Sequence, residues 1–120
     1  MIWKFITFLV RKLEPEVAHQ ISLIALKLGF HPRLKRIEIP VKINNLHFTN
    51  FLGVAAGFDK NAQIIERIHY LNFGLTEVGT ITPLPQYGNP KPRVFRLEKD
   101  KAIINRNGFN NLGMAQAEKK

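Results

Sequence analysis

The sequence predicts an α/β fold in which two helices precede the beginning of a parallel sheet. Apolar residues recur at helical spacing through residues 2–28. Further along, strand patterns at 51–55 and 75–78 enclose a helical pattern at 62–71, which is a βαβ unit. The chain has 120 residues, 45% of them hydrophobic, so it can form one packed domain. A complete eight-fold β/α barrel of about 250 residues does not fit this length.

The first predicted helix has an apolar face opposite a basic one. Its apolar residues are Ile2, Trp3, Phe5, Ile6, Leu9, Val10 and Leu13, and its basic residues are Lys4, Arg11 and Lys12. Glu14-Pro15-Glu16 predicts the start of a second helix, because proline fits the first turn and acidic groups oppose the positive end of the helix dipole. This helix should run to Leu28, with Gly29 as its stop.

The second helix is apolar on two sides. One stripe consists of Val17, Ile21, Ile24 and Leu28, and the other of His19, Leu23 and Leu26. A helix docked on a soluble core needs only one apolar stripe. Two stripes indicate a sandwiched helix, a partner or a lipid-facing surface.

The remaining elements follow from alternation and turn residues. Residues 31–40 are a basic linker, and 41–48 form a hairpin around Asn44-Asn45, a dipeptide that tolerates a tight turn. A proline-rich loop, 83–92, precedes a second hairpin, Val94–Leu97 with Ala102–Asn105. The final segment, 112–120, predicts a helix that is cut off, and most of a parallel domain is missing.

Charge and composition restrict the function only in part. With 18 Lys+Arg against 9 Asp+Glu, the net charge of +9 allows nucleic acid, anionic lipid or an acidic small molecule as partner. The absence of cysteine excludes disulfides and thiolate chemistry. No stretch has the roughly 20 apolar residues that span a bilayer, and no secretory signal is expected.

Three segments carry side chains that suit a binding site. At 55–61, after the first parallel strand, small residues allow close approach to a flat ligand, and Asp59 or Asn61 could cap the next helix. We expect Lys60 in or before that helix's first turn, where the dipole disfavours a cation. Gly79-Thr80 follows the second strand, and 105–111 holds four asparagines, which can bind carbonyl and N–H edges. Each segment, taken alone, also fits an ordinary turn.

The blocks Ala55–Asn61, Gly79–Arg96 (GTITPLPQYGNPKPRVFR) and Ile104–Gly113 (INRNGFNNLG) together closely resemble class 2 dihydroorotate dehydrogenase. This family contains membrane-associated, quinone-reducing flavoenzymes of pyrimidine synthesis. The resemblance implies a β/α (TIM) barrel with an N-terminal two-helix extension, incomplete in this chain. It divides the chain into the extension and linker, 1–36, and the first hairpin and βαβ portion of the barrel, 37–120.

The resemblance also implies the ligands and their contacts. The cofactor would be FMN, and dihydroorotate would be oxidised to orotate with quinone as the acceptor. Cofactor contacts would come from Ala56, Gly57, Phe58, Asp59, Lys60 and Thr80, and substrate contacts from Lys60, Asn105, Arg106, Asn107, Gly108 and Phe109. The family's serine base falls beyond Lys120, and no metal is implied. We therefore expect this chain alone to be inactive.

The family's quinone-facing polar residues are matched by His19 in the extension and by Arg96 on the first strand of the second hairpin. We expect one stripe of the second helix to pack, and the stripe with His19 to line a passage for the isoprenoid tail. The helices would bind the cytoplasmic face of a bacterial inner membrane peripherally, since no mitochondrial transit peptide is evident.

Two non-enzymatic functions remain as alternatives. A basic membrane-surface module without catalysis would use the aromatic and basic residues of the first helix, but it leaves the asparagine loop unexplained. A nucleic-acid binder would use the positive charge. Because the basic residues are spread along the chain, we expect no nucleic-acid partner.

Overall fold

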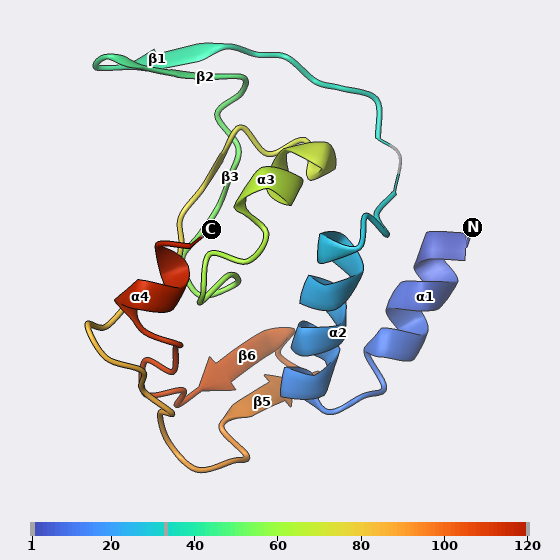
Figure 1. Ribbon diagram of the computed structural model, residues 1–120. Helices are drawn as coiled ribbons and strands as arrows, with labels where there is room; N and C mark the ends of the chain where they lie inside the picture. Colours follow the sequence, from blue (N-terminus) through green and yellow to red (C-terminus); the bar gives the residue numbers. More distant parts are fainter. Residues whose placement is uncertain (1, 33, 120) are drawn as a thin grey trace.

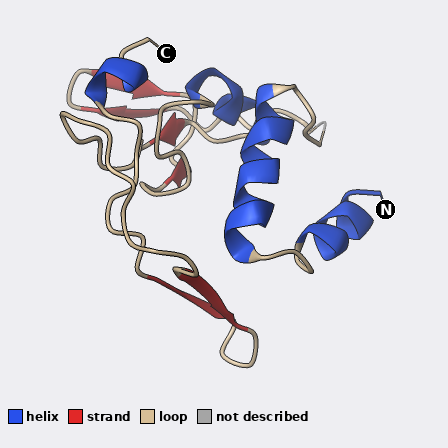
Figure 2. Cartoon of the chain, turned by 60° about the horizontal axis from the view of Figure 1, so that its bottom comes forward, coloured by secondary structure: helices blue, strands red, loops and turns tan. Residues whose placement is uncertain are grey.

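The computed structural model describes residues 2–32 and 34–119 as a mixed α/β structure (Figure 1). Helices α1 (Ile2–Val10) and α2 (Pro15–Lys27) lie side by side, with α1 on the outer side, as the rotated view in Figure 2 also shows. All residues of α1 are described, and none is buried. Both predicted helices are confirmed, although α1 ends at Val10 rather than Leu13.

The ends of α2 form as the sequence predicts. The Glu14 carboxylate accepts a hydrogen bond of 2.9 Å from the Val17 N–H, and Pro15 occupies the first turn, where no backbone donor is needed. At the other end, Gly29 has a φ of +84°, a conformation that favours glycine.

Only one apolar stripe of α2 packs on the core, and it is the stripe that contains His19. Leu23 and Leu26 are 4% and 7% exposed and pack with Ile64 and Ile68. The opposite stripe of Val17, Ile21, Ile24 and Leu28 is exposed. The expectation that the other stripe would do the packing is therefore wrong: the stripe with His19 packs through its two leucines.

A hairpin and a parallel strand pair follow. Strands β1 (Val41–Ile43) and β2 (Leu46–Phe48) pair antiparallel, and Asn44 takes a φ of +52° in the turn. Strand β3 (Gly53–Val54) pairs parallel with β4 (Leu75–Thr76). The predicted hairpin and βαβ unit are confirmed, with shorter parallel strands than expected.

The connecting helix of this unit is shorter than the pattern at 62–71 predicts. It consists of α3 (Ile65–Ile68) and the 3-10 turn η1 (His69–Leu71). Ala62 has a φ of +56°, which excludes it from a right-handed helix. The Asp59 carboxylate instead accepts backbone hydrogen bonds in the preceding turn.

The last elements flank the proline-rich loop. Strands β5 (Val94–Leu97) and β6 (Ala102–Asn105) form the predicted antiparallel hairpin beneath α2 (Figure 1). The expected C-terminal helix is limited to α4 (Met114–Ala117), and its expected last residue, Lys120, lies outside the described residues. Within residues 2–32 and 34–119, no helix combines the length and apolar character needed to cross a membrane.

Candidate functional site

The loops after β3 and β4 lie against each other. The Gly79 N–H donates a 2.8 Å hydrogen bond to the Asp59 carbonyl. A Cβ atom at Gly79 would be 3.3 Å from the Lys60 Cα, which is tighter than usual packing, and 3.5 Å from the Gly57 nitrogen, an ordinary contact. The parallel pairing of the two strands therefore brings the first two predicted segments together at one edge.

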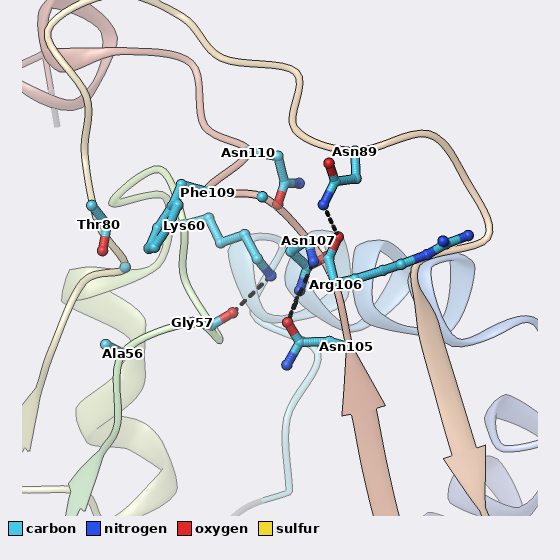
Figure 3. A pocket seen from close by; sticks show the side chains of 12 residues that line it. Ala56, Gly57, Lys60, Thr80, Asn89, Asn105, Arg106, Asn107, Phe109 and Asn110 are labelled. Atoms are coloured by element: carbon cyan, nitrogen blue, oxygen red, sulfur yellow. Dashed lines mark hydrogen bonds between the residues drawn. The ribbon is translucent and has the colours of Figure 1, made fainter.

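The third segment, after β6, completes a cavity of about 520 Å³ over this edge (Figure 3). The cavity is lined by Ala56, Gly57, Lys60, Gly79, Thr80, Asn89, Asn105, Arg106, Asn107, Gly108, Phe109 and Asn110. Gly57 has a φ of +105°, and a Cβ atom there would meet nothing within 4 Å. The backbone at Gly57 thus faces open space.

Lys60 provides a cation inside this cavity. Its ammonium Nζ donates a 2.8 Å hydrogen bond to the Gly57 carbonyl (Figure 3). Burial lowers the pKa of Lys60, and the charge of Arg93 lowers it further, whereas the Glu16 carboxylate raises it. We predicted Lys60 in or before the first turn of a helix, where the dipole disfavours a cation. This prediction is wrong, since α3 begins only at Ile65.

The asparagine loop is held by hydrogen bonds of its own. Asn107 Nδ2 donates to Asn105 Oδ1 at 3.1 Å. Asn89 supports the loop from outside: its N–H donates to the Asn107 carbonyl at 3.0 Å, and its Nδ2 donates to the Arg106 carbonyl at 2.7 Å. The backbone that carries the amide groups of the cavity is therefore held in place by hydrogen bonds.

Three predicted site residues direct their side chains elsewhere. Asp59 is 2% exposed, and its carboxylate accepts from three backbone N–H groups, at 3.1, 2.9 and 2.8 Å. Phe58 packs against the core. The Arg106 guanidinium points away from the cavity in Figure 3; it donates to the Pro92 carbonyl and lies 5.9 Å from the Phe95 ring centroid.

Sequence reasoning missed Asn89 and Asn110 as cavity-lining residues, and it gave Gly79 no binding role. Asn89 lies within the GNPKPR stretch, and Asn110 belongs to the asparagine-rich segment, so a signal existed for both. Their orientation toward the cavity depends on the meeting of two distant loops.

A second cavity of about 260 Å³ lies between α2 and the hairpin β5–β6. His19 and Arg96, far apart in the sequence, both line it. Gly57, Lys60 and Asn105 line both cavities. The two cavities therefore share a wall, and Lys60 is part of it.

His19 and Arg96 are both hydrogen-bonded to backbone carbonyls. His19 Nε2 lies 2.6 Å from the Phe58 carbonyl oxygen. Burial lowers the pKa of His19, while the Phe58 hydrogen bond raises it and the charge of Lys60 lowers it. Arg96 Nη1 donates to the carbonyls of Arg11 and Leu13, at 2.9 and 2.6 Å, and so fixes the turn between the two helices.

Known proteins resemble this chain in sequence and in fold. A family model described as "Dihydroorotate dehydrogenase" matches residues 38–120. The chain belongs to this family. A dihydroorotate dehydrogenase (quinone) of Bartonella tribocorum is 54% identical over 103 residues, which is 84% of this chain and 29% of the relative. One of Erythrobacter litoralis is 48% identical and covers 100% of this chain and 36% of the relative.

Solved structures of the family have the same fold over most of the chain. The DHODH of Eimeria tenella in complex with ferulenol gives a TM-score of 0.83 at 47% identity, over 88% of this chain and 29% of that one. The ligand-free structure from the same organism gives 0.82, again at 47% identity, over 88% of this chain and 30% of that one. The chain spans about a third of the length of the curated relatives described above.

Proposed function

We propose that this chain is the N-terminal part of a quinone-dependent dihydroorotate dehydrogenase of pyrimidine biosynthesis. The observation that carries the proposal is the convergence of three distant loops, after β3, β4 and β6, on the cavity that contains Lys60. Residues 1–36 would form the extension and linker, and 37–120 the beginning of a TIM barrel. Relatives with the name dihydroorotate dehydrogenase (quinone) support the assignment.

The cavity suits FMN as the cofactor. The open space at Gly57 and the small side chain of Ala56 leave room for a flat ring system, and Thr80 adds a hydroxyl group. When bound, FMN supplies the redox chemistry by accepting a hydride. In this chain Ala56, Gly57 and Thr80 would hold it, with Lys60 beside it.

Dihydroorotate fits the other side of the cavity. It has a carboxylate and amide edges, so it needs a cation and groups that both donate and accept hydrogen bonds. Lys60 provides the cation, Asn105 and Asn107 provide the amides, and Phe109 provides an apolar face. The proton removed from the substrate would pass to a serine base outside this chain, which alone is expected to be inactive.

The second cavity is our candidate for the quinone site. It is lined by His19 and Arg96 and shares Lys60 with the first cavity, so an electron acceptor there would be next to the flavin. We further propose that the extension lies on the membrane surface, at the cytoplasmic face of a bacterial inner membrane. Exposed apolar side chains on both helices support this, among them Ile2, Phe5, Phe8, Ile21 and Ile24.

The proposal is tested by separating the two half-reactions in a full-length chimera. In this chimera, residues 1–120 replace the matching part of the Bartonella tribocorum relative. Deleting residues 1–13, which removes α1 but keeps Glu16 and the core leucines of α2, should leave flavin reduction by dihydroorotate nearly unchanged but slow the reoxidation by a long-tailed quinone, as measured by stopped-flow absorbance. Reoxidation by a small water-soluble acceptor is the control. If the deletion variant reoxidises with the quinone as fast as the intact chimera, the role of the extension is wrong.

A further inference from the structure

A buried ion pair joins α2 to the loop that precedes β5. Glu16 and Arg93, 77 positions apart, are 9% and 7% exposed. Arg93 Nε and Nη2 lie 3.0 and 2.9 Å from Glu16 Oε1. The sequence places Glu16 in the first helical turn, where an acidic residue is usual, and gives no indication of this second role.

Arg93 also holds the two loops that form one wall of the substrate cavity. Its Nη1 donates to the carbonyls of Tyr87 and Asn89, at 2.6 and 3.1 Å, and its own carbonyl accepts from the Arg106 N–H at 2.8 Å. Asn89 in turn braces the asparagine loop through two hydrogen bonds. The guanidinium thus holds the 87–89 loop directly and reaches the asparagine loop through Asn89.

The 87–89 loop and the asparagine loop pack closely against each other, so neither can move without the other. A Cβ atom at Gly88 would collide with the Asn107 carbonyl oxygen, and one at Gly108 would come within 3.0 Å of the Asn89 nitrogen. A shift of the 87–89 loop is therefore transmitted directly to Asn107 and Gly108. Both of these residues line the substrate cavity.

The Glu16 carboxylate determines how the guanidinium is oriented. Arginine has five donors in a rigid fork, and neutral carbonyls hold it less strongly than a charged carboxylate does. Because the pair is buried, losing the carboxylate would leave a cation without its counter-charge. Lys91 Nζ lies 3.8 Å from Glu16 Oε2 and is mostly exposed, so it is a weaker partner of the carboxylate; as a cation it cannot replace Glu16 as the partner of Arg93.

We propose that Glu16 is a positioning residue that acts through Arg93. It couples the seating of the helical extension on the barrel portion to the shape of the cavity wall formed by 87–89 and 105–110. The nature of the cavity's ligand rests on the proposed function. The coupling itself concerns only residues of this chain.

The first test measures hydrogen–deuterium exchange in the full-length chimera. In Glu16→Ala, exchange in peptides covering 86–93 and 105–111 should rise about tenfold, the effect of losing one charged hydrogen bond, and by less in Glu16→Gln. Glu14→Gln is the matched control. Glu14 caps the same helix through Val17, but it forms no hydrogen bond with Arg93. Unchanged exchange in both peptides with Glu16→Ala, or an equal rise with Glu14→Gln, would overturn the proposal.

The second test separates positioning from general stability. The Kd of dihydroorotate, from titration of flavin reduction, should rise several-fold in Glu16→Gln and stay unchanged in Glu14→Gln. Arg93→Lys should resemble Glu16→Gln, and the double variant should add little, because both changes remove the same connection. If the exchange effect appears in a chimera that binds no flavin, the coupling holds and only the proposed function fails. Fully additive effects of the two substitutions would contradict the coupling.

Discussion

The His19 ring and the Phe58 carbonyl, 39 positions apart, are joined by a hydrogen bond of 2.6 Å. A carbonyl oxygen only accepts, so Nε2 carries the proton and Nδ1 is the acceptor of the neutral ring. The rings of the same two residues meet edge to face, with centroids 5.4 Å apart. This contact attaches α2 to the loop that leads into Lys60.

We expect the stability contribution of His19 to decrease in acid. Its pKa is lowered, chiefly by burial, so below its ordinary value of about 6.5 the unfolded state binds a proton more readily than the folded state. In the chimera, the loss of unfolding free energy caused by His19→Gln should therefore be larger at pH 8 than at pH 5. Urea unfolding at both pH values measures it, with the exposed His47→Gln as control. A loss that is the same at both pH values would disprove the argument.

Lys60→Ala should slow flavin reduction by dihydroorotate in the chimera. Loss of the cation in the cavity should remove about 2–4 kcal/mol of transition-state stabilisation, seen in anaerobic single-turnover experiments. Lys42→Ala, on the exposed face of β1, is the matched control and should leave the rate unchanged. Near-normal reduction in Lys60→Ala would remove this lysine from the site.

Gly57→Ala should weaken flavin binding, because the new methyl group would occupy cavity space without contacting any protein atom. Gly57 and Gly29 both have positive φ and open space around a Cβ atom. Each substitution to alanine should cost about 1 kcal/mol or more of stability through backbone strain. Only Gly57→Ala should also lower the flavin content of the purified chimera, measured by absorbance. Equal flavin content in both variants would argue against cofactor binding at Gly57.

Arg96→Ala should loosen the turn between α1 and α2. The guanidinium donates to two carbonyls of this turn, so its loss frees a segment that contains the tryptic sites Arg11 and Lys12. Limited trypsin digestion followed by mass spectrometry should show faster cleavage there. Arg36→Ala, which removes only an exposed pair with Glu38, is the control. An unchanged cleavage rate would show that Arg96 does not hold the turn.

Local patterns predicted the elements that local chemistry determines. The start of α2 follows from Glu14 and Pro15, and the β1–β2 turn follows from Asn44. The helical pattern at 62–71 failed at Ala62. This residue takes a left-handed conformation in the turn whose backbone N–H groups donate to the buried Asp59 carboxylate. Periodicity also showed two stripes on α2 but not which one packs, because that depends on contacts with α3.

The sequence likewise predicted only part of the candidate site. Small residues and a lysine after a strand indicated Gly57 and Lys60, and both line the cavity. The outward direction of the Arg106 side chain is set by the Pro92 carbonyl, which no spacing rule reveals. The Glu16–Arg93 pair was likewise beyond prediction, because it joins distant segments whose meeting depends on the whole fold.

The position of Trp3 on α1 determines what tryptophan fluorescence reports. It is the single tryptophan of the sequence, and it lies on a helix without a buried residue, with 38% of its own surface exposed. Tryptophan fluorescence of this chain therefore reports the surroundings of α1. A blue shift of that emission on addition of anionic vesicles is the signal expected when the helix leaves water for a lipid surface.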